Sequence, residues 1–524
     1  MKNIEINQKI SQETVTISRE DYDKLIEQNK EMSQQIKWLM ETLKLNNRKM
    51  FGSSSEKTEE DNSQLNIFNE AEEIADIRKL KPELEEVKAH YRKKRTKEDR
   101  LPEDLPIEVV EYRLNDDELD CPNCGKKLHE MGKEIVREEL KIIPAHAVIV
   151  QHVRYAYSCR NCERTGTEVP VIKAPIKKPV IKGSFASPEA VAYVMTQKYL
   201  IDIPLYRQEN DFKRRDILLS RQTMANWIMK CSEMWLKPVY DILHEKLVSC
   251  ETAHADETTI QVLKEPGKKP QSKSYMWLYR TGQYEKDKIA LYDYRDGRSA
   301  KYAQNFLKGF SGYLHCDGYQ AYKKLENVIL VQCLAHSRRK FDEALKCLNE
   351  DERKDPKAAI GLAYCNKLFK IEENIEDLAP EEKYIKRQDL AKPVFDEFFK
   401  WLNSFRPASQ SHLGKAVAYT LNQWNYLQNY MLDGRLNICN NSAEHLAKSF
   451  ALCRKNFLFS NTPRGADASA VVMSIVETSK INKIDVFEYL TYIFHNAPQL
   501  DMTKREDVEK LLPEVFKNDQ KENA

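Results

Sequence analysis

The feature that most constrains this chain is a change of pattern between residues 251 and 336, where helical spacing gives way to strand-like runs. The order strand, strand, strand, helix, strand, helix, strand predicts an α/β domain. Helical spacing returns over about residues 341–435, which indicates an insertion before the chain comes back at NNSAEHLAKSF. The strand-like runs, rich in β-branched and aromatic residues, are 258–263, 274–282, 288–295, 312–317 and 328–336.

Two aspartates lie where strands of this domain end or come close to ending. Asp256, in HADETT, shares a face of its strand with His254, whereas Glu257 points to the other face because successive side chains alternate. Asp317, in LHCDGYQAY, comes at the end of a later strand, again two residues after a histidine, His315.

A third carboxylate, Glu444, is predicted near the start of a helix that residues 440–442 (Asn, Asn, Ser) are suited to cap. Two hard cations about 4 Å apart need several anionic oxygens from separate elements. Aspartates on neighbouring strands and a carboxylate on a crossing helix can supply them. In a chain with 81 acidic residues, however, a single carboxylate is usually solvated or caps a helix, so spacing alone does not establish the site.

Two C-x-x-C pairs predict a structural zinc site. Four thiolates close a tetrahedral site and leave no position open for water. The strand-like residues 134–158 between the pairs can form a hairpin that carries both. Chance spacing and a redox pair are the alternatives, and a redox role needs a separate explanation for each pair. The predicted ligands are Cys121, Cys124, Cys159 and Cys162.

The N-terminal region carries a heptad pattern that predicts a coiled coil. Asn29 lies in its seam, where such a residue fixes the register. The alternative is one amphipathic helix packed on its own domain. Residues 56–115 are charged and indicate a linker with a helix over about 64–90. The seam positions are Tyr22, Leu25, Asn29, Met32, Ile36, Leu39, Leu43, Asn46 and Met50.

Residues 187–245 have helical spacing, after an extended Pro/Lys connector over 173–182. Within them, residues 205–228 indicate helix, turn, helix, with Ser220 as the cap of the second helix. A DNA-binding helix-turn-helix and a plain helical hairpin fit this pattern equally well.

Composition sets the class but not the function. The chain has 524 residues, enough for about three domains, and 31% of them are charged. Its net charge of +2 says nothing about nucleic acid, because the basic residues are clustered locally, at 92–95, 172–182 and 337–340. No apolar run approaches the roughly 18 residues of a membrane helix, and the N-terminus lacks a signal-peptide pattern, so a cytoplasmic protein is expected.

Several strings resemble the insertion-sequence-66 family of DDE transposases, in the family's order and over nearly the whole chain. They are FGSSSEK, CPNCGKKL, IPLYRQE, LSRQTMANW, HADET, CDGYQAY, CLAHSRRKF, NNSAEHLAKSFALCRKNFLFS and VETSKINKID. The resemblance implies an RNase H-like catalytic domain whose triad is Asp256, Asp317 and Glu444. It also implies an N-terminal leucine zipper, a zinc-binding domain and a helical segment that bind transposon ends.

The chain departs from the family pattern at three places near the site. Leu334 stands where the family has Trp, Cys439 where it usually has Asp, and His445 where it has Arg. None of these changes removes a carboxylate.

Further residues are candidates for supporting roles. Cys333 and His336 form a C-x-x-H pair, either half of a metal site or a structural feature at a strand end near the active site. His254 and His315 are predicted to orient the carboxylates from behind, so that His254→Ala lowers metal affinity. Basic residues predicted to hold DNA phosphate are Arg338, Arg339, Lys340, Lys448, Arg454, Lys455 and Arg464.

The sequence therefore predicts a multidomain α+β transposase that nicks transposon ends and transfers the freed 3′-hydroxyl to target DNA. Mg²⁺ is the expected ion, with Mn²⁺ as a substitute. The expected partners are transposon-end and target DNA, at least a second copy of the chain, and small accessory proteins. The alternatives are an inactive zinc-containing DNA-binding regulator and a nuclease without strand transfer. The predicted divisions are a coiled-coil helix (1–55), a linker (56–115), a zinc-ribbon-like domain (116–172), a helix-turn-helix-like segment (173–248), the RNase H-like domain (249–465) and C-terminal helices (466–524).

Overall fold

The computed structural model describes residues 147–158, 171–348 and 357–523, with scattered helical positions between residues 19 and 40. Internal contacts divide the chain into two units, Pro82–Ile176 and the remainder. Of the predicted heptad, Asn29, Met32, Ile36 and Leu39 are described, and all are helical and exposed. The other heptad positions and the linker helix lie outside the described residues. None of the described helices is long and apolar enough to cross a membrane.

In the smaller unit the described residues form an antiparallel pair of strands. β1 (Ala156–Ser158) pairs with β2 (Val171–Lys173), with Tyr157 opposite Ile172. Of the predicted strand before the second cysteine pair, residues 147–155 are described as irregular and residues 156–158 as strand. The partner strand that the structure describes, β2, follows that cysteine pair. The first predicted arm of the hairpin, 134–144, lies outside the described residues.

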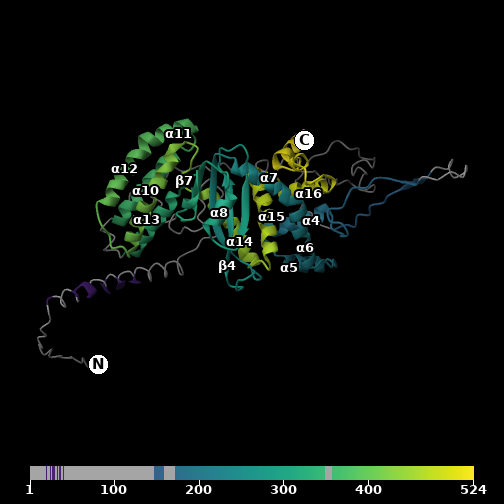
Figure 1. The fold of residues 1–524 in the computed structure, drawn as a ribbon, viewed down its shortest axis with the longest axis horizontal. Helices are drawn as coiled ribbons and strands as arrows, with labels where there is room; N and C mark the ends of the chain where they lie inside the picture. The colour runs from purple at the N-terminus through teal and green to yellow at the C-terminus, as the bar shows by residue number, and fades with distance from the viewer. Residues whose placement is uncertain are drawn as a thin grey trace, which may run out of the picture. The chain divides into compact units, whose positions relative to one another are not determined.

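The larger unit is built on a mixed five-stranded sheet in the order β5-β4-β3-β6-β7 (Figure 1). Its first three strands form an antiparallel meander, and the last two add parallel to β3 on its other side. This agrees with the predicted order of strands. The strands are β3 (Thr252–Gln261), β4 (Lys273–Thr281), β5 (Ala290–Arg295), β6 (Tyr313–Cys316) and β7 (Ile329–Gln332).

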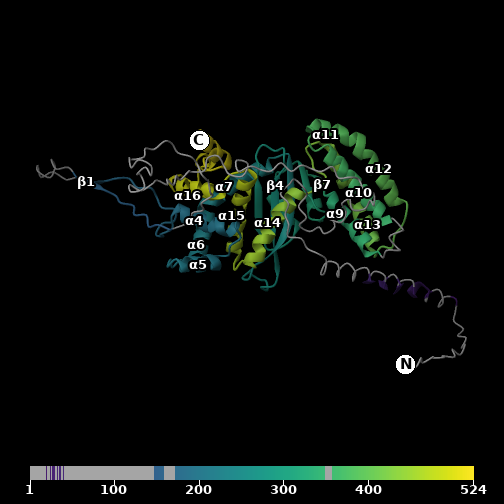
Figure 2. The same ribbon diagram turned by 180° about the vertical axis from the view of Figure 1, so that it is seen from behind.

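Helices cover both faces of this sheet. On one face, α14 (Asn441–Phe457) packs across β3 and β4 (Figure 2). On that face the Tyr292 hydroxyl of β5 donates to the Leu446 carbonyl at 3.0 Å. On the other face, α8 (Ala300–Phe306) stacks Phe306 on Tyr279 of β4, with ring centroids 3.9 Å apart. The alternation of side chains along β3 thus sends neighbouring residues into two different environments.

Side chains satisfy the backbone groups at both edges of the sheet. On α15 (Pro463–Ile481), Ser474 accepts from Tyr292 N at 2.8 Å, and Thr478 bonds both N and O of Ala290 in β5. At the opposite edge, Asn429 Nδ2 donates to the Leu330 carbonyl of β7 at 2.8 Å. Open strand edges invite pairing with other chains, and these bonds block it.

The helical segment before the sheet contains the predicted helix, turn and helix. Its helices are α4 (Pro188–Tyr199), α5 (Leu205–Arg214), α6 (Arg221–Cys231) and α7 (Lys237–Val248). Ser220 caps α6, as predicted, by accepting from Thr223 N at 3.1 Å.

A π-helical turn, Ser232–Leu236, joins α6 to α7 just before Pro238. A second π-helical turn, Arg387–Ala391, precedes Pro393 in the same way. Proline lacks the N–H that would continue the regular bonding, so the turn before it widens to bonds between residues five apart.

The predicted insertion has a hydrophobic core of its own beside β7 (Figure 1). It begins with α9 at Leu334, so residues 334–336, predicted as the end of a strand, are the first turn of a helix. The periodic burial of Leu334, Phe341 and Ala344 sets the helical register. Its helices are α9 (Leu334–Cys347), α10 (Lys357–Asn374), α11 (Pro380–Lys386), α12 (Lys392–Asn403) and α13 (His412–Leu427), followed by the 3₁₀ turn η6 (Gln428–Leu432).

The C-terminal helices share one hydrophobic core with the sheet and with α4–α7. α15 packs on β5, and α16 (Val486–Asn496) packs on α4. The chain ends in the 3₁₀ turn η7 (Ala497–Gln499), α17 (Arg505–Glu509) and α18 (Pro513–Asn523). The boundaries predicted near residues 248 and 465 are therefore crossed by one continuous core.

Candidate active site

Strand register places the histidines before the two aspartates side by side. β3 and β6 run parallel, and the last paired residues are His254 and His315. Each aspartate comes two residues after its histidine, Asp256 still within β3 and Asp317 one residue after the end of β6. The repeated His-x-Asp string is the sequence signal for this pairing.

The charges of both other predicted carboxylates act on Asp256. Burial raises the pKa of Asp256 well above its ordinary value. The negative charges of Glu257 and Asp317 raise it further, and that of Glu444 adds to the effect. The Glu257 backbone N–H, which donates to Asp256 Oδ1 at 2.8 Å, offsets only part of this. The folded protein therefore disfavours the ionised form of Asp256.

Glu257 is a fourth acidic residue, which sequence reasoning set aside because it points to the other face. Its side chain is 1% exposed and accepts from Tyr322 Oη at 2.6 Å and from Arg298 Nε at 2.7 Å. Burial raises the pKa of Glu257, and the charge of Asp317 adds to that rise.

The Arg298 guanidinium connects Glu257 to the residues around the second aspartate, Asp317. It lies 3.8 Å from the centroid of the Tyr319 ring, and Tyr319 N donates to Asp317 Oδ1 at 2.9 Å. Glu257 and Arg298 thus brace the turn that carries Asp317.

Asn440 connects the third carboxylate to the first strand. It is the residue before α14, but its side chain does not cap the helix, contrary to the prediction. Its Oδ1 lies 2.9 Å from His254 Nδ1, and its Nδ2 donates to the Ala255 carbonyl at 2.9 Å. These buried bonds fix the N-terminus of α14, and hence Glu444, against the residue next to Asp256.

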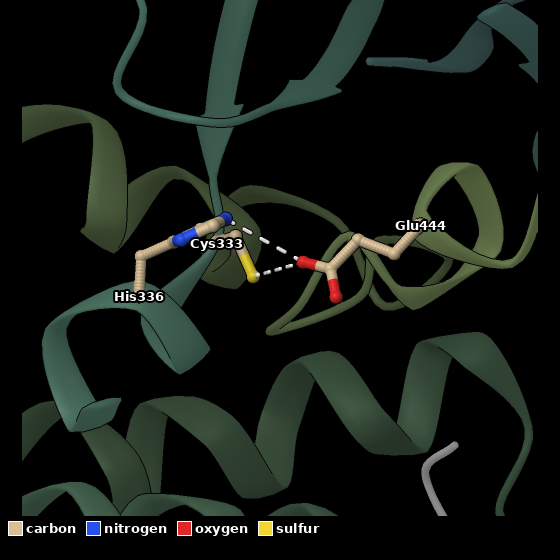
Figure 3. A group of neighbouring side chains, drawn as sticks. All are labelled: Cys333, His336 and Glu444. Carbon is tan, nitrogen blue, oxygen red and sulfur yellow. Dashed lines mark hydrogen bonds and ion pairs between the residues drawn. The ribbon is translucent and has the colours of Figure 1, made fainter. Parts of the chain in front are cut away.

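Glu444 already has partners within the protein (Figure 3). His336 Nε2 lies 3.5 Å from its Oε1, and Cys333 Sγ lies 3.9 Å from the same oxygen. Burial alone would raise the pKa of Glu444, but His336, Arg339 and Cys333 together bring it below its ordinary value. The third carboxylate is thus electrostatically compensated, unlike Asp256.

The two histidines beside the aspartates pack on each other and do not bond the carboxylates. Their rings stack with centroids 4.3 Å apart, and burial lowers the pKa of His254 to about 4 and that of His315 well below its ordinary value. Both rings are therefore neutral at pH 7. His254 acts on the site through Asn440, while His315 Nε2 accepts from Asn437 N at 3.5 Å.

The predicted phosphate-binding residues divide by what they contact. Arg338 bonds Asn366 Oδ1, Arg454 bonds Thr259 Oγ1, and Arg464 is ion-paired with Glu233. Lys340 lies over the Tyr419 ring, Arg339 affects the pKa of Glu444, Lys448 is half-buried, and Lys455 is exposed.

Among the departures from the family pattern, Leu334 is buried in the core of the insertion, and His445 and Cys439 are half-buried. The four predicted zinc ligands, Cys121, Cys124, Cys159 and Cys162, lie outside the described residues.

Comparison with known families decides what this fold belongs to. Residues 183–468, more than half of the chain, match the family described as "Transposase IS66 family". The chain belongs to the IS66 family of transposases. Two further matches agree: residues 118–163 match the zinc-finger binding domain of transposase IS66, and residues 38–110 match a region described as "Transposase C of IS166 homeodomain". The predicted family is confirmed.

Similar proteins extend over most of the chain. An uncharacterized protein of Sinorhizobium fredii, y4jD, is 30% identical over 436 residues, which cover 80% of this chain and 82% of the relative. A second one from that organism, y4hP, is 29% identical over 76% of this chain and 73% of its own length. A solved structure, the Drosophila P element transposase strand transfer complex, aligns at 11% identity with a TM-score of 0.30 over 57% of this chain and 93% of its own.

Proposed function

We propose that this member of the IS66 family is a DDE transposase that cleaves transposon ends and joins the freed 3′ ends to target DNA. Asp256, Asp317 and Glu444 form its catalytic triad. The observation that carries the proposal is the convergence of three carboxylates from β3, the end of β6 and the start of α14, through which Asp317 and Glu444 both raise the pKa of Asp256. A regulator without catalysis has no need of such a set.

The donor set fits a pair of Mg²⁺ ions, with Mn²⁺ as a substitute. All three groups offer hard anionic oxygens, and their mutual repulsion is what a divalent cation would relieve. When bound, such a pair activates the attacking water or 3′-hydroxyl and stabilises the leaving oxygen. The chain's own part would be to present Asp256 from β3 and Asp317 from the end of the adjacent β6, and to bring Glu444 to them through Asn440.

The proposed DNA contacts lie on α6 and around the triad. The buried face of α6 includes Met224 and Trp227, and its exposed positions include Arg221, Gln222 and Asn226. A polar face on the second helix of a helix-turn-helix is suited to phosphates and base edges. Lys455 and Arg464 would add phosphate contacts, Arg464 by exchanging Glu233 for DNA.

Zinc and self-association complete the proposal. The four cysteines within the zinc-finger match, Cys121, Cys124, Cys159 and Cys162, would hold one Zn²⁺. The N-terminal heptad would pair two copies of the chain, since two DNA ends require at least a dimer.

The test is to incubate the protein with labelled transposon-end DNA and Mg²⁺, using Asp256→Asn as the inactive variant. Asp293→Asn is the matched control, because Asp293 is a largely buried carboxylate of the same sheet that pairs with Arg295. Nicking and joining by the wild type and by Asp293→Asn, but not by Asp256→Asn, supports the proposal. Cleavage without joining supports a nuclease, and no cleavage supports a DNA-binding regulator.

A further inference from the structure

Glu444 faces two further groups that are metal ligands in other proteins. Cys333 is the one residue between β7 and α9, and His336 lies in the first turn of α9. Both side chains point at the Glu444 carboxylate (Figure 3). The Sγ, imidazole nitrogen and carboxylate oxygen all lie within 4.8 Å of one another. Among the described residues, only this group of His, Cys, Asp and Glu side chains has such spacing.

The spacing is close to that of a tetrahedral zinc site. Zinc bonds of about 2.3 Å to sulfur and about 2.0–2.2 Å to nitrogen and oxygen put neighbouring ligand atoms roughly 3.3–3.6 Å apart. The separations here are 3.5 Å from His336 Nε2 to Glu444 Oε1 and 3.9 Å from Cys333 Sγ to that oxygen. The third pair, Cys333 Sγ and the His336 ring nitrogen, lies within 4.8 Å, so side-chain movements of about an ångström or less would close the site around an ion.

Burial and the charge of Glu444 raise the pKa of Cys333 well above its ordinary value, so its thiolate would form as an ion binds. Cys333 is the residue before α9, where the helix dipole offsets part of that cost. The backbone N–H of Asn440 points at its sulfur, 3.2 Å away. The cysteine is buried, but the side chains of His336 and Glu444 are 26% and 20% exposed, so an ion can enter from their side.

The ligand types distinguish this group from the carboxylate triad. Mg²⁺ takes oxygen ligands, whereas thiolate and imidazole select zinc and similar ions. We propose that Cys333, His336 and Glu444 form a second zinc site, separate from the four-cysteine site, and that zinc bound there inhibits the enzyme. The inhibition rests on the proposed function, because zinc would hold the carboxylate that the triad shares.

Metal content tests the site without any activity measurement. Purified full-length protein is equilibrated with buffered micromolar Zn²⁺, and bound zinc is counted by mass spectrometry. Wild type is expected to hold one zinc per chain more than Cys333→Ser or His336→Gln. Affinity at this site should fall by more than about tenfold, since even changes to residues behind the ligands cost 10–100-fold. Cys365→Ser, which changes a buried cysteine of the insertion, should keep the full zinc content.

Equal zinc content in wild type, Cys333→Ser and His336→Gln would overturn the site. Circular dichroism and melting curves identify a variant that has failed to fold. Replacing Zn²⁺ with Co²⁺ gives a second readout, because a thiolate ligand adds a charge-transfer band that Cys333→Ser must lack. Cys121→Ser changes the four-cysteine site instead, so it should remove the part of the band that comes from that site.

Inhibition is tested at saturating Mg²⁺ with increasing zinc. Half-inhibition of DNA cleavage should need about tenfold more zinc in Cys333→Ser than in wild type, relative to each protein's own rate without zinc. Identical zinc sensitivity would overturn the inhibitory role. If wild type holds the extra zinc but never cleaves DNA with Mg²⁺, the zinc site stands and the transposase proposal fails.

Discussion

The two sides of the candidate active site differ in how their charge is balanced. On the aspartate side, burial and the charges of Glu257 and Asp317 raise the pKa of Asp256 well above its ordinary value. On the glutamate side, His336, Arg339 and Cys333 overcome the effect of burial and lower the pKa of Glu444. Among the residues that the structure describes, Asp256 therefore has no basic partner that lowers its pKa, whereas Glu444 has two. The parallel strands β3 and β6 carry the first side, and the helix end held by Asn440 carries the second.

The largest expected effect tests whether both sides serve one reaction. Glu444→Gln should reduce single-turnover cleavage of end DNA by more than about 100-fold, as Asp256→Asn should, because each removes a metal ligand. Glu251→Gln, an exposed glutamate one residue before β3, is the control and should remain active. A Glu444→Gln enzyme with near wild-type rates would remove Glu444 from the triad.

The next effect concerns the connection between the two sides. Asn440→Ala leaves His254 Nδ1 and the Ala255 carbonyl without their partner. The free energy of unfolding should fall by about 2–4 kcal/mol, since each buried group left unsatisfied costs about 1–3 kcal/mol. Cleavage measured well below the melting temperature should fall about 10–100-fold through misplacement of Glu444. An unchanged rate in folded Asn440→Ala would show that Glu444 is positioned by other contacts.

On the aspartate side, Glu257 has the positioning role that Asn440 has on the glutamate side. Glu257→Gln removes the ion pair with Arg298 and should lower cleavage about tenfold by loosening the Asp317 turn. Tyr322→Phe removes only the hydroxyl that donates to Glu257 and should cost about 1 kcal/mol of stability with a smaller loss of rate. Equal rates for Glu257→Gln and wild type would limit Glu257 to a structural role.

The smallest effect has opposite signs on the two sides. In chelator at pH 7, Asp256→Asn should raise the melting temperature by on the order of 2 °C, and Glu444→Gln should lower it. Because the folded-state pKa of Asp256 is raised, the fold loses stability as the pH rises above the unfolded-state pKa of that group. Because the folded-state pKa of Glu444 is lowered, its ionisation adds stability above its unfolded-state pKa, and that stability is lost as the pH falls through the folded-state pKa. Shifts of the same sign in differential scanning fluorimetry would contradict the comparison.

The strands that carry the two aspartates could be predicted from sequence because they depend on local rules. Strand patterning anticipated β3 and β6, and the repeated His-x-Asp string corresponds to the paired His254 and His315 at the end of their ladder. Alternation also predicted correctly that Glu257 faces away from His254 and Asp256. It could not show that Tyr322 and Arg298 fill that other face, because they come from segments after β5.

The glutamate side could be predicted only in part. The helix carrying Glu444 was expected, but Asn440 was predicted to cap it. Its side chain instead bonds His254, 186 residues away, and a capping rule that considers only neighbours in sequence cannot detect such a partner. The start of α9 was missed for a similar reason, since the apolar residues before His336 fit a strand and a helix equally well.

The measurement that tests the central claim most directly is anomalous X-ray diffraction from crystals of the protein with transposon-end DNA and Mn²⁺. If the two sides form one metal site, manganese will be bound by oxygens of Asp256, Asp317 and Glu444, and Glu444 will have left His336. Manganese on the aspartates alone, with Glu444 still bonded to His336 in the DNA complex, would contradict the account.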